Sequence, residues 1–236
     1  VGHTGAVGYH AMLAADQDMI GVSLTAGGVL VAPTFGAAPR LGTNPIAVAA
    51  PTGTKPRFLY DAATSVVAAN KLVLADRLNV PLHGGWIAGW NGAPIMEDAY
   101  LPPRDQYVML PLGSTREMSS HKGYGLALVN EILCSVLGSA VPAMLDPDSG
   151  SKQFLAAYDI SAFGDVDRFK ASMDEMLETL LQTPTAPGHE RVIYPGIAED
   201  EELSRRLRDG IPLHREVIDW FTQVCDELGI PPLEVA

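Results

Sequence analysis

Four short segments of this 236-residue chain carry the side chains that could do chemistry together. They are His3-Thr4-Gly5-Ala6-Val7-Gly8, Leu41-Gly42-Thr43-Asn44-Pro45, Asp61-Ala62-Ala63-Thr64-Ser65 and His121-Lys122-Gly123-Tyr124-Gly125. Histidine exchanges a proton near neutral pH, and threonine and asparagine side chains can bind a carboxylate or an amide. The combination favours a site that binds a small acid and moves a proton.

The segment from His121 to Gly125 could seat an anion. A helix is expected to begin there, so free backbone N–H groups and a partial positive charge would face the ligand, and Lys122 adds a full charge. Such a seat suits a pyrophosphate or a ribose phosphate. The alternative is a glycine-packed helix start with a solvated lysine.

The segment from Asp61 to Ser65 is expected at a turn from a strand into a helix. Asp61 could accept hydrogen bonds from ribose hydroxyls, while Thr64 and Ser65 cap the helix and expose N–H groups. Capping alone would also account for Thr64 and Ser65. Thr43 and Asn44, which precede another strand, could bind a substrate or stabilise their own turn.

A Rossmann dinucleotide site is not expected. It requires a strand, a G-x-G-x-x-G turn that opens a helix, and an acidic residue at the end of the next strand. Gly2, Gly5 and Gly8 have a different spacing, and the glycine-rich segment 84–92 runs towards Pro94 and not into a helix. A dinucleotide would have to be bound in another way.

The four segments, in this order and with Tyr194-Pro195-Gly196 after them, resemble the type-2 malate/L-lactate dehydrogenase family. The resemblance implies hydride transfer between NAD or NADP and the 2-carbon of a small carboxylic acid, with His3 as the acid/base. It also implies that the substrate contacts His3, Thr43 and Asn44. The implied cofactor contacts are Asp61, Ala62, Ala63, Thr64, Ser65, His121, Lys122, Gly123 and Gly196.

The same resemblance implies an α/β fold with a mixed-sheet, non-Rossmann nicotinamide-binding domain flanked by helices, and a homodimer. It further implies a preceding N-terminal segment with a Ser-His-Gly motif, which this chain does not contain. We expect an α/β domain over residues 1–213, with a C-terminal helix over 214–236 packing on it.

The chain departs from the family pattern at three places. Leu24-Thr25-Ala26-Gly27 replaces Leu-Thr-Asn-Ser, Ala88-Gly89-Trp90 lacks an aspartate, and Ala62 replaces a methionine. Two alternatives therefore stay open. One is a reductase of a cyclic imino acid, and the other is a non-catalytic member that acts as a binding or assembly subunit.

Composition narrows the class of protein. A net charge of −12 argues against a nucleic-acid partner, because binding phosphates requires clustered lysine and arginine. The apolar runs are too short or too interrupted to span a membrane. No histidine pair has metal-ligand spacing supported by carboxylates, so we expect no metal. Cys134 and Cys225 match no disulfide or metal pattern, which favours buried thiols in the cytoplasm.

Hydrophobic periodicity and turn residues predict the elements that position these segments. The expected strands are 22–32 in part, 46–50, 57–60 and 154–160, with a polar loop over 146–152. The expected helices are 9–19, 66–78 with Ser65 as N-cap, and 122–137, the last apolar nearly all round and buried. Two amphipathic helices are expected from the apolar stripes over 166–180 and 217–228.

Overall fold

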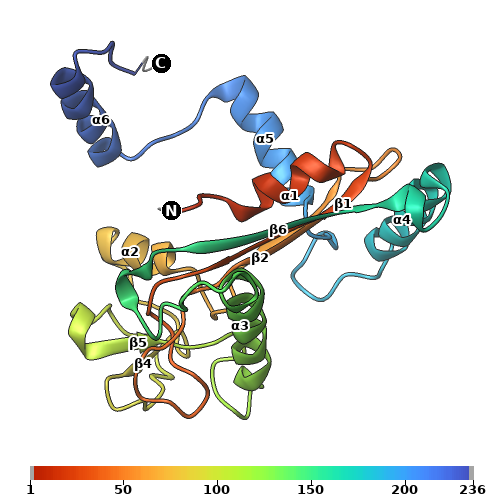
Figure 1. Ribbon diagram of the computed structural model, residues 1–236. Coiled ribbons are helices and arrows are strands. Elements are labelled where there is room, and N and C mark those ends of the chain that lie inside the picture. The colour runs from red at the N-terminus through yellow and green to blue at the C-terminus, as the bar shows by residue number, and fades with distance from the viewer. Residues whose placement is uncertain (1–2, 234–236) are drawn as a thin grey trace. The chain divides into compact units, whose positions relative to one another are not determined.

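The computed structural model describes residues 3–233 and divides into two compact units, Val1–Pro195 and Gly196–Ala236 (Figure 1). All four chemistry-bearing segments lie in the first unit. The predicted domains 1–213 and 214–236 stay a prediction. Within the described residues, no helix has both the length and the apolar character needed to cross a membrane.

The first unit is built on a four-stranded antiparallel sheet in the order β3-β2-β1-β6. The strands are β1 (Met19–Ala26), β2 (Ile46–Ala50), β3 (Phe58–Ala62) and β6 (Lys152–Asp159). β2 has the bounds predicted for it. The strand register places Asp61 opposite Ala47 and Thr25 opposite Gln153.

Helices cover both faces of this sheet. α1 (Val7–Ala15) packs on one face and α3 (Ser120–Cys134) on the other (Figure 1). Alternation along the strands explains the two layers: Ala47 and Ala49 pack against α1, whereas Leu24 and Ala26 pack against Cys134 of α3. Burial on this side raises the pKa of the Cys134 thiol to about 11.

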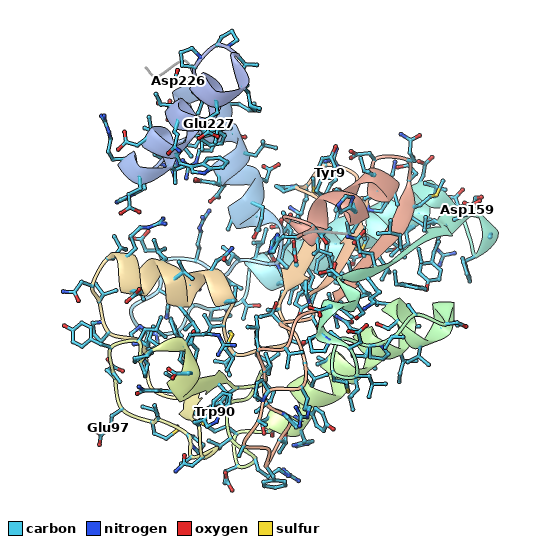
Figure 2. The ribbon with its side chains drawn as sticks, turned by 60° about the vertical axis from the view of Figure 1, so that its left-hand side comes forward. Tyr9, Trp90, Glu97, Asp159, Asp226 and Glu227 are labelled. Atoms are coloured by element: carbon cyan, nitrogen blue, oxygen red, sulfur yellow. The ribbon has the colours of Figure 1, made fainter. Side chains whose placement is uncertain are left out.

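Close backbone contact fixes α1 on the sheet. A Cβ on Gly21 would lie 2.0 Å from the carbonyl oxygen of Ala11, so only glycine permits this approach. The opposite side of α1 faces solvent, where the side chain of Tyr9 is 59% exposed (Figure 2). The position of His3, four residues before α1, therefore depends on how α1 is seated.

A second core lies beside α3. It joins α2 (Ala69–Arg77) to a two-stranded sheet of β4 (Ile87–Gly89) and β5 (Tyr107–Met109). Its buried side chains include Leu72, Ile87, Met109 and Ala127 of α3. Short 3-10 helices span Arg104–Gln106, Val136–Gly138, Pro147–Ser149 and Ile160–Ala162. α3 thus separates the large sheet from the second core.

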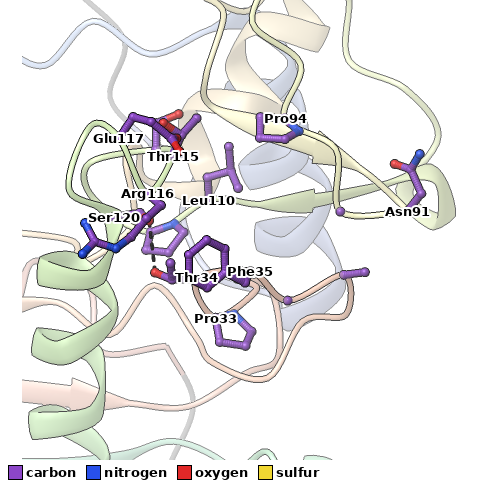
Figure 3. A pocket seen from close by; sticks show the side chains of 15 residues that line it. Pro33, Thr34, Phe35, Asn91, Pro94, Leu110, Thr115, Arg116, Glu117 and Ser120 are labelled. Atoms are coloured by element: carbon purple, nitrogen blue, oxygen red, sulfur yellow. Dashed lines mark hydrogen bonds between the residues drawn. The ribbon is translucent and has the colours of Figure 1, made fainter.

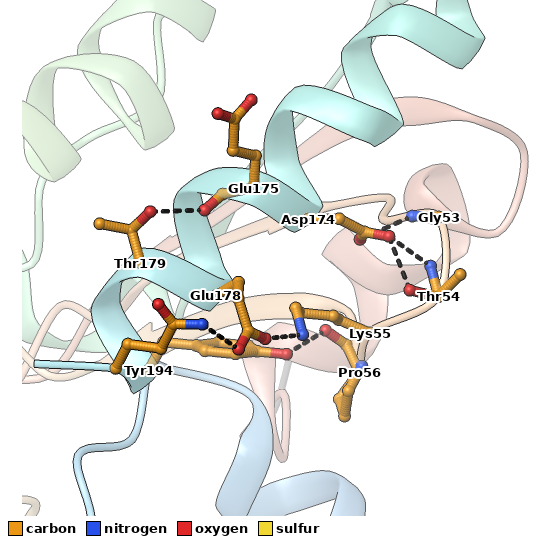
Figure 4. A network of polar contacts seen from close by, with 10 residues as sticks. Gly53, Thr54, Lys55, Pro56, Asp174, Glu175, Glu178, Thr179 and Tyr194 are labelled. Carbon is orange, nitrogen blue, oxygen red and sulfur yellow. Dashed lines mark hydrogen bonds and ion pairs between the residues drawn. The ribbon is translucent and has the colours of Figure 1, made fainter.

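A polar network fastens α4 (Val166–Leu181) to the loop between β2 and β3 (Figure 4). The Asp174 carboxylate accepts from the backbone N–H groups of Gly53 and Thr54 at 3.0 and 2.7 Å, and from the Thr54 hydroxyl. Burial works to raise the pKa of Asp174, but hydrogen bonds from Thr54, Gly53 and Lys55 outweigh it and hold that pKa below its usual value. Lys55 also pairs with Glu178.

The second unit contains α5 (Ile197–Asp209) and α6 (Arg215–Leu228). The predicted stripe of α6 is present in part: Val217, Phe221 and Val224 are partly buried and Cys225 is buried, whereas Leu228 is exposed. α5 was not predicted as a helix.

Three predicted helices differ from the structure. The first helix ends at Ala15, and Asp18 takes a φ of 57° before β1 begins at Met19. α2 begins at Ala69, because Ser65 pairs with Pro111 and the Val66 N–H donates to the carbonyl oxygen of Leu110. These bonds keep 65–66 out of the helix, and Ala68 is the N-cap residue, so the prediction of Ser65 as N-cap is wrong.

The third difference concerns α3. It ends at Cys134, and the side chains of Leu126, Val129 and Ile132 are 38%, 45% and 55% exposed. The prediction of a helix buried on all sides is wrong. Two polar residues, Asn130 and Glu131, occupy its inward face, and the three apolar side chains lie on the side that is exposed. The α/β architecture without a Rossmann unit is confirmed. Its two sheets are antiparallel, and the isolated bridge between Val31 and Met109 is parallel.

Candidate active site

A cavity of about 90 Å³ gathers three of the predicted site residues, His3, Thr43 and Asn44. It lies where the segment before α1 meets the end of β1 and the turn before β2. Thr25, Gly27 and Ser151 also line it, although the sequence did not identify them as site residues. We call this space the His3 cavity.

His3 is exposed, and its ring is oriented by its own turn. The backbone N–H of Gly5 donates to His3 Nδ1 at 3.0 Å. Nδ1 must be unprotonated to accept this bond, so the proton of the neutral ring lies on Nε2. His3 can therefore offer an N–H donor to a ligand oxygen, and a second proton on Nδ1 would require that the bond from Gly5 breaks.

Thr43 and Asn44 differ in their burial and in the hydrogen bonds of their side chains. Thr43 is half-buried at the wall of the His3 cavity. Asn44 is 1% exposed, and its Nδ2 donates to Glu131 Oε1 at 3.0 Å and to the Ala127 carbonyl oxygen at 3.2 Å. Its Oδ1 accepts from the Gly27 N–H at 3.3 Å. Asn44 thus ties the turn to α3, and its contact with substrate stays a prediction.

α3 also binds this turn through Asn130. Its Nδ2 donates to the carbonyl oxygens of Asn44 and Pro45, while its Oδ1 is buried and finds no hydrogen-bond partner among the residues that the structure describes. Glu131, 3% exposed, accepts from Ser135 as well as from Asn44. Neither residue was predicted as part of the site. The available signal was two adjacent polar side chains within an otherwise apolar helix.

Asp61 is exposed at the end of β3. Its Oδ2 accepts from the N–H of Gly8, in the first turn of α1, at 2.7 Å. A Cβ on Gly8 would lie 2.9 Å from the same oxygen, so glycine leaves room for this bond. Asp61 therefore fixes the start of α1, and its predicted contact with a ribose stays a prediction.

Thr64 links two other segments of the chain by hydrogen bonds and does not cap a helix. It is 3% exposed, its N–H donates to the carbonyl oxygen of Thr43 at 2.8 Å, and its carbonyl oxygen accepts from Leu112 N–H at 2.8 Å. Ser65, 2% exposed, donates its hydroxyl to the carbonyl oxygen of Val67. The prediction that Thr64 and Ser65 cap a helix is thus wrong. Ala62 and Ala63, which precede them, are partly buried.

The segment that begins α3 packs against Leu112, which is hydrogen-bonded to Thr64. A Cβ on Gly123 would lie 2.5 Å from both N and O of Leu112, so glycine lets the helix pack directly on that backbone. His121 and Lys122 are exposed on the first turn. They do not line the His3 cavity. Hydrogen bonds and close packing thus join Thr43, Thr64, Leu112 and Gly123 into one scaffold.

Gly196 belongs to the second unit. It takes a φ of 113° as the N-cap residue of α5, and its N–H donates to Glu199 Oε2 at 3.2 Å. Its predicted cofactor contact stays a prediction.

Comparison with known proteins identifies the family. The malate/L-lactate dehydrogenase family model matches residues 1–222. The chain is 36% identical to malate dehydrogenase from Pyrococcus abyssi, over 99% of this chain and 65% of that protein. It is 31% identical to L-sulfolactate dehydrogenase from Methanocaldococcus jannaschii, over 97% of this chain and 64% of that protein.

Solved structures agree. Malate dehydrogenase from Entamoeba histolytica has a TM-score of 0.89 at 30% identity, covering 97% of this chain and 66% of that one. A Δ1-piperideine-2-carboxylate reductase from Pseudomonas syringae, 23% identical, shares the fold with a TM-score of 0.71 over 93% of this chain and 64% of that one. The chain spans about two thirds of the length of these relatives. On the family match and these likenesses, the chain belongs to the malate/L-lactate dehydrogenase family.

Proposed function

We propose that this protein is an NAD(P)-dependent oxidoreductase that interconverts a small 2-keto acid and its 2-hydroxy acid. The observation that supports the proposal is the His3 cavity, which is lined by a histidine ring that can exchange a proton and by a threonine on a turn that is hydrogen-bonded to α3. Its volume of about 90 Å³ suits a molecule of a few heavy atoms. Several relatives are named for such acids: malate, sulfolactate and ureidoglycolate.

The chain's own groups define the mechanism. His3 Nε2–H donates to the substrate carbonyl oxygen and stabilises the negative charge that reduction places there. Proton delivery then follows protonation of His3 at Nδ1, with loss of the bond from Gly5. The Thr43 hydroxyl orients the substrate carboxylate, and Asn44 holds Thr43 in place through α3.

The residues fit a dinucleotide near the start of α3. Lys122 is an exposed cation on the first turn of a 15-residue helix. Asp61 Oδ2 accepts from Gly8, whereas Oδ1 has no hydrogen-bond partner in the described part of the chain. When bound, the nicotinamide supplies or accepts the hydride at the substrate 2-carbon.

The test is turnover of a panel of 2-keto acids with NADH and with NADPH. His3→Ala should lower kcat at least about hundredfold while nucleotide binding, followed by fluorescence, is unchanged. His189→Ala, at an exposed histidine that does not line the cavity, serves as the control. Unchanged kcat in His3→Ala with intact cofactor affinity would contradict the assignment. Turnover of cyclic imines alone would favour the imine reductase, and absence of turnover with every substrate would favour the non-catalytic member.

Assembly and location are part of the same proposal. We expect a homodimer, which the exposed apolar residues Leu126, Val129 and Ile132 of α3 support, and a cytoplasmic protein, which the two free thiols support. Light scattering on the purified protein gives the oligomeric state, and a single-chain mass would contradict the homodimer.

A further inference from the structure

The proposed reaction requires that His3 stays at the His3 cavity, and the hydrogen bond of its own ring cannot ensure this. The bond from the Gly5 N–H to His3 Nδ1 lies within one turn, so it orients the ring only relative to that turn. Of residues 3–6, which precede α1, His3, Gly5 and Ala6 are exposed and Thr4 is half-buried. Thr4 is therefore placed to attach this turn to the rest of the first unit.

A side chain of β6 holds Thr4. Gln153 Nε2 donates to the Thr4 hydroxyl oxygen at 2.7 Å. The same hydroxyl lies 3.5 Å from the hydroxyl of Thr25, on β1, which is a long contact. The bond from Gln153 is therefore the stronger of the two.

The sheet explains why Gln153 reaches Thr4. The strand register places Gln153 directly opposite Thr25, so the two side chains leave the same face of the sheet. Gly21 of β1 lies on that face as well, because residues four apart on a strand share a face. Since Gly21 contacts α1, this is the face that α1 covers. Gln153 thus reaches from an edge strand to the segment that leads into α1.

Another attachment of this segment lies further along the chain. The backbone N–H of Gly8 donates to Asp61 Oδ2 at 2.7 Å, which fixes the first turn of α1. Thr4 is adjacent to His3, whereas four residues separate Gly8 from it. Without the bond from Gln153, the place of His3 would depend on the attachment at Gly8 and on the long contact with Thr25.

Gln153 acts from outside the cavity. Thr4 and Thr25 line the His3 cavity together with His3, whereas Gln153 is not a lining residue. We propose that Gln153 is a positioning residue: its hydrogen bond to Thr4 keeps His3 at the cavity, within reach of a substrate oxygen. The catalytic consequence rests on the proposed function. Because displacing a reacting group by about 1 Å can slow a reaction about hundredfold, loss of this bond should be visible in kcat.

The experiment removes the bond from either side. Gln153→Met keeps the length of the side chain without its donor, and Thr4→Val keeps the shape of the side chain without its hydroxyl. Heteronuclear NOEs of the backbone amides of residues 4–6 measure the order of the segment by NMR. Steady-state kinetics with a 2-keto acid and NADH or NADPH give kcat and KM.

Both variants should lower the NOEs of residues 4–6 towards those of flexible segments. In Gln153→Met, kcat should fall about tenfold or more, with a smaller change in KM and an unchanged Tm. Thr4→Ser, which keeps the hydroxyl, should retain the wild-type NOEs and kcat. The double variant should have the kcat of Thr4→Val alone, because both substitutions remove one bond.

Two matched controls separate this bond from general effects of the substitutions. Gln182→Met also removes a donor, because exposed Gln182 donates from Nε2 to Glu178 Oε1 at 2.8 Å, and it should leave the NOEs and kcat unchanged. Thr34→Val also removes a half-buried threonine hydroxyl, which shares a hydrogen bond of 3.0 Å with Ser120 (Figure 3). Thr34 lines a separate cavity of about 290 Å³, so this variant should leave the NOEs of residues 4–6 unchanged.

Wild-type NOEs or a wild-type kcat in Gln153→Met would overturn the inference, and so would losses that multiply in the double variant. A fall in Tm and kcat with unchanged NOEs would also overturn it, because Gln153 would then act on the fold as a whole. Failure of the proposed function is a separate outcome. It is seen when the wild-type protein turns over no substrate, and the NOEs then decide by themselves whether Gln153 holds His3 in place.

Discussion

Replacing Asn44 by aspartate tests the hydrogen bonds between the turn before β2 and α3. Asn44→Asp keeps the shape of the side chain but replaces the Nδ2 donor with an oxygen. This oxygen would lie 3.0 Å from Glu131 Oε1 and 3.2 Å from the carbonyl oxygen of Ala127. Two hydrogen bonds become contacts between acceptors, at a position 1% exposed.

The size of the stability loss in Asn44→Asp follows from these distances. Two unit charges 3.0 Å apart repel by about 5 kcal/mol at an effective dielectric constant of about 20. Protonating one carboxyl at pH 7 costs about 4 kcal/mol, so a shared proton limits the loss to about that value. The folded variant then binds one proton more than the unfolded chain, and its stability falls as the pH rises. The deficit should therefore be large at pH 7 and small near pH 4.

Urea unfolding at both pH values measures this deficit. Asn79→Asp is the matched control, because Asn79 also takes a positive φ, 51°, but is exposed. Adding Glu131→Gln to Asn44→Asp restores a donor between the two side chains and should recover part of the stability, while the contact with the Ala127 carbonyl oxygen remains. The reasoning is refuted if Asn44→Asp costs no more than Asn79→Asp at pH 7, or if Glu131→Gln recovers nothing.

Three further predictions concern packing, acid stability and thiol reactivity. Gly123→Ala should destabilise the protein, since its Cβ meets backbone at 2.5 Å, whereas Gly125→Ala, with nothing within 4 Å, should be neutral or stabilising by up to about 1 kcal/mol in urea unfolding. Asp174→Asn should lower stability at pH 7, and it should abolish the part of the wild-type acid sensitivity that arises as the pH falls through the depressed pKa of Asp174. Glu175→Gln, on the same helix, should have neither effect. Equal dependence of unfolding on pH in the two variants would contradict this role of Asp174. Cys134, with a pKa raised to about 11, should resist iodoacetamide at pH 8 until urea unfolds the chain, as read by mass spectrometry; rapid labelling of the native protein would contradict its burial.

Sequence patterns predicted the sheet better than the start of α2. β2 has its predicted bounds because the alternation of its residues matches the two faces that it buries. Ser65 was expected to cap α2 because serine before a helix usually does so. Its actual pairing with Pro111 is a contact between distant parts of the chain. Local rules carry no information on such pairings.

The same limit applies to the site. The motifs indicated His3 and Thr43, but only the antiparallel pairing of β1 with β2, together with the seating of α1, brings them to one cavity. For α3, composition predicted burial because most of its residues are apolar. Asn130 and Glu131 reverse this expectation, since polar groups that bind the turn displace apolar side chains from the inward face.

Membership in a motif does not imply contact with a ligand. The side chains of Asn44 and Thr64 form hydrogen bonds with other segments of the chain. Gly123 must be glycine because the backbone of Leu112 packs directly on it. By contrast, His3 Nε2 and the Lys122 ammonium have no hydrogen-bond partner among residues 3–233, which the structure describes. Substitutions in the first group would lower activity by displacing Thr43, and those in the second by removing a ligand contact. Stability separates the two groups: the first should lose folding free energy together with activity, and the second activity alone.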